Sequence, residues 1–330
     1  MLAAYAARID PDRPLDALAV GEIDIAATPG GAQTPDDWVE IEVRAAALNH
    51  HDLFSLRGVG LPSEAVPMVL GCDAAGIAPD GSEVIVHSVI NDPGYAGQDT
   101  TCDPRRTLLS ERYPGTLAER VRVPRRNLVV KPAELEFAEA ACLPTAWLTA
   151  YRMLFVQSGL RPGQTVLVQG AGGGVATALV LLARHAGLQV WVTSRSPERG
   201  ERAVGLGAHA WFPSGARLPE RVDAVMESVG AATWSHSINA LRPGGTVVLC
   251  GTTSGAEPAR AELTRIFFRP LRVIGSTMGT REELQDLVGL LVATGLRPVI
   301  DSRTPLADAR DAFRRLESGA GFGKLVITTA

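Results

Sequence analysis

Lysine is almost absent from this sequence, and cysteine is scarce. Lys131 and Lys324 are the only lysines among the 330 residues, so nearly all basic side chains are arginines. The four cysteines lie far apart and form no CxxC pair. A disulfide framework is therefore not expected, and a cytoplasmic location is the default prediction.

Long hydrophobic runs and an excess of charge are also missing. No apolar run is long enough to span a bilayer, and the start MLAAYAARIDPDRP lacks the basic region of a signal peptide. The net charge of −4 and the pI near 5.9 give no indication of a nucleic-acid or membrane binder. A hydrophobic content of 46% and a length of 330 residues are typical of a globular protein with two domains.

The most informative stretch is TVLVQGAGGGVATALVLLA, residues 165–183. An apolar strand leads into a glycine-rich turn, and an apolar helix follows. Glycines permit a tight turn and close approach to phosphate, while the helix N-terminus offers free N–H groups and a positive dipole end. A further strand at Gln189–Thr193 falls where a dinucleotide-binding βαβ unit needs it. The alternative is a glycine-rich turn in some other α/β protein.

The end of that second strand bears on the choice of cofactor. An NAD site usually places Asp or Glu there to hold the ribose 2′-hydroxyl. Here the strand runs into Ser194 and Arg195, with Arg199 shortly after. Two arginines and a hydroxyl suit a 2′-phosphate, so we expect NADPH rather than NADH. The alternative is a pair of solvated surface arginines.

The pattern of predicted secondary structure changes near residue 130. The first part is β-rich, with short strands expected at 38–44, 68–77, 83–86 and 115–124, a short helix within 48–56 and a surface loop at 91–113. Residues 137–160 read as two helical pieces broken at Pro144. Strands then alternate with helices, including strands at 223–227 and 246–250, and a helix at 307–316 precedes a final strand. This order predicts an α/β protein with a parallel sheet.

Several motifs occur in an order and spacing that resembles the medium-chain dehydrogenase/reductase superfamily. They include LNHHDL, VLGCDAAG, GTLAERVRVP, VLVQGAGGGVA and LRPGGTVVLCG. The resemblance implies a GroES-like β-barrel catalytic domain at 1–130, to which 272–330 return, and a Rossmann NADPH-binding domain at 131–271. It also implies a homodimer formed through the Rossmann edge near Leu271–Met278.

Whether zinc is bound decides which reaction this resemblance implies. The ligand positions of the zinc alcohol dehydrogenases fall here on Asn49, Cys72 and Thr145, which leave one useful ligand where zinc needs three or four. The lobe that holds structural zinc needs four close cysteines, and the loop at 91–113 has only Cys102. We therefore expect no metal. The sequence is similar to the zinc-free quinone oxidoreductase and enoyl-reductase branch, in which NADPH is the usual reductant.

An improvised metal site remains as the alternative. Two adjacent histidines and their neighbours supply possible ligands, namely His50, His51, Asp52, Cys72 and Asp73. Adjacent side chains on a helix point about 100° apart, so both histidines rarely reach one ion.

Without zinc, hydride transfer to a quinone or to an activated C=C bond of an enone or enal is the expected reaction. The product enolate needs hydrogen-bond donors. Asn49 is the first choice by its place in the resembled fold; His50, His51 and Tyr113 are the other candidates. Asp52 is expected to orient the local turn. A zinc alcohol dehydrogenase with an atypical site and an NADPH-binding protein with little catalysis stay open, and so does the natural small-molecule acceptor.

The predicted sites can be stated residue by residue. The predicted catalytic residues are Asn49, His50 and Asp52. The glycine turn and the tip of the second strand are expected to bind the cofactor through Gly170, Ala171, Gly172, Gly173, Gly174, Val175, Ser194, Arg195 and Arg199. The resemblance and the carboxyl end of the 246–250 strand add Thr145, Thr149, Cys250, Gly251, Thr252 and Lys324.

Overall fold

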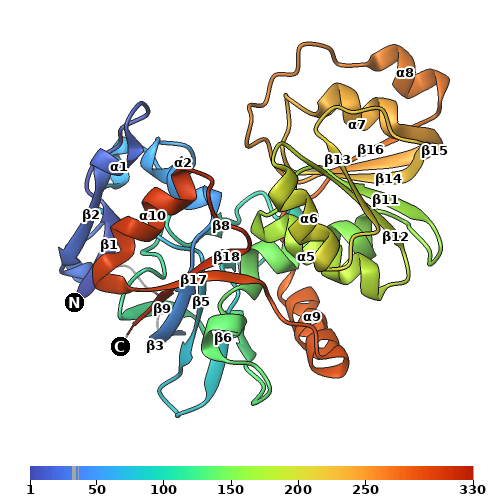
Figure 1. Ribbon diagram of the computed structural model, residues 1–330. Helices are drawn as coiled ribbons and strands as arrows, with labels where there is room; N and C mark the ends of the chain where they lie inside the picture. The colour runs from blue at the N-terminus through green and yellow to red at the C-terminus, as the bar shows by residue number, and fades with distance from the viewer. Residues whose placement is uncertain (32–34, 36, 330) are drawn as a thin grey trace. The chain divides into compact units, whose positions relative to one another are not determined.

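The computed structural model describes residues 1–31, 35 and 37–329 and divides the chain into two compact units (Figure 1). Met1–Thr145 with Thr280–Ala330 forms one unit, here the barrel unit, and Ala146–Gly279 forms the other, here the sheet unit. Both boundaries lie later in the chain than the predicted ones. The first shifts because the segment Phe137–Ala140 packs on barrel strands, and the second because Arg272–Gly275 is a strand of the sheet unit.

The barrel unit contains a seven-stranded sheet with the order β10-β6-β5-β3-β18-β17, and β9 pairs with β3 off this path. Its strands are β3 (Trp38–Ala47), β5 (Asp73–Ile77), β6 (Glu83–Val86), β9 (Arg120–Pro124), β10 (Leu128–Val130), β17 (Ile300–Pro305) and β18 (Lys324–Thr328). The shorter strands are β1 (Leu2–Ala6), β2 (Leu18–Glu22), β4 (Met68–Val69), β7 (Val89–Ile90) and β8 (Thr107–Leu108).

Alternation explains why β3 anchors the barrel unit. Ile41, Val43 and Ala45 are buried while Glu40 and Glu42 are exposed, the period-two pattern of a strand with one face on the core. β3 pairs with β5, β9 and β18. The expected strand at 68–77 is interrupted: β4 ends at Val69, β5 begins at Asp73, and Gly71 between them has φ +99°.

The C-terminal residues return to the barrel unit, as the resemblance implies. Leu306 and Phe313 join the same hydrophobic core as Leu53 and Leu56, and β18 pairs antiparallel with β3. Both ends of the chain therefore lie in this unit (Figure 1). Its helices are α1 (Pro14–Ala17), α2 (His50–Leu56), α3 (Phe137–Ala140), α9 (Arg281–Thr294) and α10 (Ala309–Glu317).

The sheet unit is a six-stranded sheet with the order β13-β12-β11-β14-β15-β16, and every pair in it is parallel. Its strands are β11 (Thr165–Val168), β12 (Gln189–Ser194), β13 (Ala210–Pro213), β14 (Val222–Glu227), β15 (Leu241–Leu249) and β16 (Arg272–Gly275). The order reverses between β11 and β14, which is the doubly wound Rossmann arrangement and confirms the predicted fold class.

Helices cover both faces of this sheet. They are α4 (Leu148–Tyr151), α5 (Gly174–His185), α6 (Pro197–Gly205), α7 (Trp234–Ala240) and α8 (Leu263–Phe268). Figure 1 shows α5 and α6 together on one side of the sheet and α7 on the other. Ile238 of α7 packs with Leu167 and Val225 from the central strands, so burial of near-continuous apolar strands holds this layer together.

The stretch from Phe137 to Gln157 is less regular than two broken helices. α3 ends at Ala140, before Pro144, and π-helical turns at Leu143–Trp147 and Arg152–Gln157 flank α4. Within the described residues, no helix has both the length and the apolar composition needed to cross a bilayer.

Candidate active site

Asn49 joins the end of β3 to the start of α2, and its side chain is fully engaged. The amide nitrogen Nδ2 donates to the Ala47 carbonyl at 3.3 Å and to Asp73 Oδ2 at 2.9 Å. Its oxygen Oδ1 accepts from Lys324 Nζ at 2.7 Å. An amide has only two N–H groups, so none is left to donate to a substrate. This geometry speaks against the predicted donor role of Asn49.

Asp52 holds the beginning of α2 in place. Its carboxylate accepts from the Asn49 N–H at 2.8 Å and from the Gly71 N–H at 3.1 Å, and the side chain is completely buried. Burial raises the pKa of Asp52 to about 7, against the effect of these two hydrogen bonds. Asp52 thus ties α2 to the turn between β4 and β5, which agrees with an orienting role.

Lys324 reaches the same cluster from β18. Its ammonium donates to the Leu48 carbonyl at 2.8 Å, to Asn49 Oδ1 at 2.7 Å and to Asp73 Oδ2 at 3.1 Å. The three N–H groups of a lysine are then all used. This arrangement, within the barrel unit, speaks against the predicted contact of Lys324 with the cofactor. Sequence reasoning did not connect Asp73 with Lys324, since they lie 251 positions apart.

His50 and His51 point to different surroundings, as adjacent helical residues do. His51 Nε2 lies 3.7 Å from Glu111 Oε1 and 3.4 Å from Ser55 Oγ, and burial lowers the pKa of His51 to about 4. The His50 side chain is exposed, and no described residue hydrogen-bonds to its ring nitrogens. Partial loss of hydration, with the Lys324 charge nearby, lowers the pKa of His50.

Two residues of the loop at 91–113 lie next to these elements. Glu111 Oε1 lies 3.7 Å from His51 Nε2, and burial raises the pKa of Glu111. Nothing in the sequence pattern indicated this contact. The ring of Tyr113, a candidate donor, packs on Trp38 with the ring centroids 4.7 Å apart.

Asp52 and His51 should give protein stability opposite pH dependences. The pKa of Asp52, about 7, lies above its unfolded value, so its stabilising contribution is complete below about pH 4 and is lost as pH rises to 7. The pKa of His51, about 4, lies below its unfolded value, so its contribution grows between about pH 4 and 6.5. We expect Asp52→Asn to make the unfolding free energy rise more steeply with pH, by up to about 1.4 kcal/mol per unit.

Urea unfolding of both proteins across this pH range measures the difference. His51→Asn is the matched control and should change the slope in the opposite direction. Parallel profiles for wild type and Asp52→Asn would contradict the raised pKa.

The residues at the zinc-ligand positions of the resembled enzymes do not fit zinc. The Asn49 amide is engaged as described, and Cys72 Sγ donates to the Leu109 carbonyl at 3.5 Å. With an amide at Asn49 and a hydroxyl at Thr145, Cys72 is the one useful ligand at these three positions, whereas zinc needs three or four. In the part of the chain that the structure describes, no group of three His, Cys, Asp or Glu side chains is placed to hold a metal. This includes the alternative cluster around His50 and His51.

The glycine turn of the sheet unit leaves its backbone donors open. Gly170 and Gly172 have φ of +82° and +110°, conformations that favour glycine. The N–H groups of residues 171–175 have no acceptor among the described residues, and they lead into the N-terminus of α5. A Cβ added at Gly173 would meet no atom within 4 Å. The arrangement fits a pyrophosphate.

The tip of β12 places its three predicted residues together. Ser194 is buried, and its hydroxyl donates to the Ser196 carbonyl at 2.7 Å, which leaves no proton for a phosphate. Arg195 is exposed, and Arg199 lies in the first turn of α6, with Ser196 as the helix N-cap. The two arginines, rather than the serine, carry the chemistry for an anion.

The other predicted cofactor residues lie in three places. Cys250, Gly251 and Thr252 follow β15 at the same sheet edge as the glycine turn, and burial raises the pKa of Cys250 to about 12. Thr149 is buried on α4. The Thr145 hydroxyl oxygen is buried and has no hydrogen-bond partner among the described residues.

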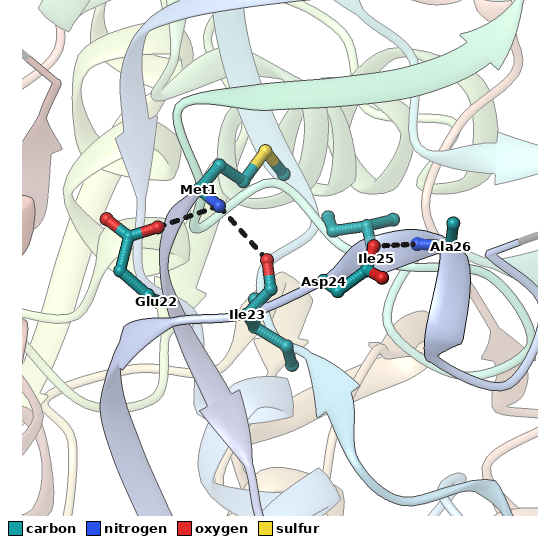
Figure 2. A pocket seen from close by; sticks show the side chains of 6 residues that line it. All are labelled: Met1, Glu22, Ile23, Asp24, Ile25 and Ala26. Atoms are coloured by element: carbon teal, nitrogen blue, oxygen red, sulfur yellow. Dashed lines mark hydrogen bonds and ion pairs between the residues drawn. The ribbon is translucent and has the colours of Figure 1, made fainter.

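An open hollow of about 550 Å³ lies elsewhere, at the edge of the barrel unit (Figure 2). Met1 and residues 22–26 line it, and its Glu22 carboxylate pairs with the Met1 ammonium at 2.8 Å. None of the predicted site residues lines it, so it has no part in the proposed chemistry.

Comparisons with known proteins cover both units. The alcohol dehydrogenase GroES-like domain model matches residues 35–133, and the zinc-binding dehydrogenase model matches residues 174–293. The zinc-type alcohol dehydrogenase-like protein YogA of Leptosphaeria maculans is 30% identical over 88% of this chain and 90% of its own. A solved NAD-dependent alcohol dehydrogenase is 30% identical and covers 100% of both chains with a TM-score of 0.89.

In two further relatives, this chain matches very different shares of the relative's own length. Acryloyl-coenzyme A reductase of Sulfurisphaera tokodaii is 25% identical over 88% of this chain and 92% of its own. The spectinabilin polyketide synthase system protein NorB of Streptomyces orinoci is 31% identical over 88% of this chain, which spans only 13% of that protein. The sequence similarity, the fold and the open glycine turn all agree on the family. This chain belongs to the medium-chain dehydrogenase/reductase superfamily of nicotinamide-dependent oxidoreductases.

Proposed function

We propose that this protein uses NADPH, without zinc, to reduce a C=C bond conjugated to a carbonyl group. The observation that carries the proposal is the set of residues at the zinc positions, where an engaged amide at Asn49 and the hydroxyl of Thr145 leave Cys72 as the one useful ligand. Oxidation of a plain alcohol would lack its Lewis acid there. An enone, enal or enoyl thioester is already activated. The similarity to an acryloyl-coenzyme A reductase supports this substrate class.

The choice of NADPH rests on the tip of β12. No acid stands there, Arg195 is exposed, and Arg199 lies in the first turn of α6. An anionic 2′-phosphate would be stabilised by both arginines and by the helix N-terminus.

The bound dinucleotide would supply a hydride, which adds to the β-carbon of the acceptor while the carbonyl oxygen gains negative charge. The N–H groups of residues 171–175 would hold the pyrophosphate, and the two arginines would hold the 2′-phosphate. His50 takes the place of Asn49 as the proposed donor, because its side chain is exposed and no described residue hydrogen-bonds to its ring nitrogens. An imidazole N–H would stabilise the enolate oxygen, and solvent would supply the proton to the α-carbon.

The test is dinucleotide oxidation by the purified protein with a panel of enals, enones, enoyl thioesters and quinones, with products identified. Saturation of the C=C bond with NADPH preferred is expected. Turnover of quinones alone would move the assignment to quinone reduction. Tight NADPH binding without any turnover would favour the non-catalytic alternative, and metal-dependent alcohol oxidation would overturn the zinc-free proposal.

Arg195→Ala is expected to raise the Kd for NADPH about tenfold and to leave the Kd for NADH unchanged. One charge-assisted hydrogen bond to phosphate contributes about 1.5 kcal/mol or more, and NADH has no 2′-phosphate. Fluorescence titration with both dinucleotides measures the effect. Arg202→Ala, later on α6, is the matched control. An equal loss for NADH would place Arg195 outside the 2′-phosphate site.

Assembly and location are part of the same proposal. We propose a homodimer through β16, the outer strand of the parallel sheet, where Val273 is 46% exposed and Phe268 of α8 is 74% exposed. The mass in solution by light scattering tests it, and a monomer at micromolar concentration would contradict it. We propose the cytoplasm as location because all four cysteines are free thiols; fractionation of the source cells tests this.

A further inference from the structure

A chain of hydrogen-bonded polar side chains, most of them buried, runs from the glycine turn across the sheet unit. Its members come from the ends of three neighbouring strands and from α7, and they are Gln169, Thr193, Glu227, His236 and Ser237. Gln169, Glu227 and Ser237 are completely buried, and Thr193 is 1% exposed. Buried polar groups are costly unless each is paired, so the pattern of their hydrogen bonds carries information.

The bonds nearest the turn fix the orientation of the Gln169 amide. The Gly170 N–H donates to Thr193 Oγ1 at 3.1 Å. The Thr193 hydroxyl in turn donates to Gln169 Oε1 at 2.6 Å. The amide nitrogen of Gln169 therefore faces the other way, 2.8 Å from His236 Nδ1 and 2.9 Å from Ser237 Oγ.

The far end of the chain agrees with this direction. His236 Nε2 lies 2.9 Å from the Ala216 carbonyl, which only accepts, so the ring proton is on Nε2 and Nδ1 accepts from Gln169. Ser237 accepts from Gln169 and donates to Glu227 Oε2 at 2.5 Å. Glu227 also accepts the N–H groups of Val229 and Gly230 at 2.7 and 3.0 Å. Each group in this series therefore donates to the next one, in a single direction from the Gly170 N–H to the Glu227 carboxylate.

The series of hydrogen-bonded side chains contacts only the first N–H donor of the glycine turn. The Gly170 N–H is held by Thr193, whereas the N–H groups of residues 171–175 have no acceptor in the described part of the chain. Gly170 has φ +82°, so the turn leaves the strand at this residue. Anchoring it sets the direction in which the following N–H groups point.

We propose that Thr193 and Gln169 are positioning residues of the cofactor site. Through the Gly170 N–H they hold the turn in the conformation that presents its free N–H groups to the dinucleotide pyrophosphate. This inference rests on the proposed function, since it requires a dinucleotide at the turn. The pyrophosphate is common to NADPH and NADH, so Thr193 acts on both, whereas Arg195 acts on the 2′-phosphate alone.

The experiment compares Thr193→Val with Thr193→Ser in the full chain, by titration of NADPH and NADH at a temperature where all variants are folded. Valine keeps the shape and removes the hydroxyl, whereas serine keeps the hydroxyl. We expect Thr193→Val to raise both Kd values about tenfold with the NADPH/NADH ratio unchanged, and Thr193→Ser to stay within about twofold of wild type. Thr246→Val, a buried threonine of β15 in the same sheet, is the control and should bind as wild type.

A second variant, Ser237→Ala, removes one hydroxyl from the series of hydrogen-bonded side chains, at a position distant from the turn. It should raise both Kd values about threefold, and it tests the inference if Thr193→Val does not fold. Wild-type affinities in Thr193→Val and Ser237→Ala would overturn the inference. A loss for NADPH alone would also overturn it and place Thr193 at the 2′-phosphate. Wild-type protein that binds neither dinucleotide would overturn the proposed function as well, so the two failures are distinguishable.

Discussion

Replacing Gly173 with valine is expected to weaken dinucleotide binding about 100-fold or more, or about 2.7 kcal/mol, without unfolding the protein. The backbone of Gly173 is in the extended region, with φ −73° and ψ 162°, which valine adopts without strain. An added Cβ would meet no protein atom within 4 Å. The side chain would occupy the space over the free N–H groups at the start of α5, where we place the pyrophosphate. Isothermal titration measures the affinity.

Gly173 is more informative here than Gly172. Gly172 has φ +110°, so any side chain there strains the backbone whether or not a ligand binds. At Gly173 the cost to folding is that of an N-cap glycine, under about 1 kcal/mol. Gly205→Ala on α6, where a Cβ also meets nothing within 4 Å, is the control and should leave affinity unchanged. Wild-type affinity in Gly173→Val would move the cofactor away from this turn.

Replacing Lys324 with methionine is expected to lower the free energy of unfolding by about 3–5 kcal/mol. Lys324 is 2% exposed and Asp73 completely buried, and their Nζ and Oδ2 atoms lie 3.1 Å apart. Methionine fills similar space but leaves the Asp73 carboxyl group buried without its cation. The Oδ1 atom of Asp73 already has no partner among the described residues, which increases its dependence on the lysine. Urea unfolding measures the loss.

The double variant Lys324→Met, Asp73→Asn separates charge from packing. Removing both charges should recover most of the stability, because the cost of a broken buried pair comes from the charge that is left behind. A single variant within about 1 kcal/mol of wild type would contradict the pairing. A double variant no better than the single one would show that lost packing, not the unpaired carboxylate, causes the effect.

Much of the sheet unit could be predicted because its signals are local. The apolar strand at Thr165–Val168, the glycine turn and the helix that follows lie within a few residues of one another, and periodicity identifies each of them. Parallel strands bring their carboxyl ends to one edge, so residues 170–175, Arg195 and Cys250 were predicted to share a site and lie at one edge of the sheet. The prediction for 137–157 was less accurate: two helical pieces were expected, whereas α3 ends at Ala140 and π-helical turns flank α4.

The sequence by itself determined the fold class, the glycine turn and the lack of zinc ligands, because each depends on residue types and on spacing along the chain. Only the tertiary structure decided what Asn49, Ser194 and Lys324 do. Asn49 and Lys324 lie 275 positions apart, and Lys324 Nζ donates to Asn49 Oδ1. The two N–H groups of the Asn49 amide are used by Ala47 and Asp73. Gln169 and Ser237, which are 68 positions apart, also meet in a hydrogen bond that only folding creates. Hydrogen-bond partners and burial arise only when distant segments fold together, and they decide which polar groups are free to act.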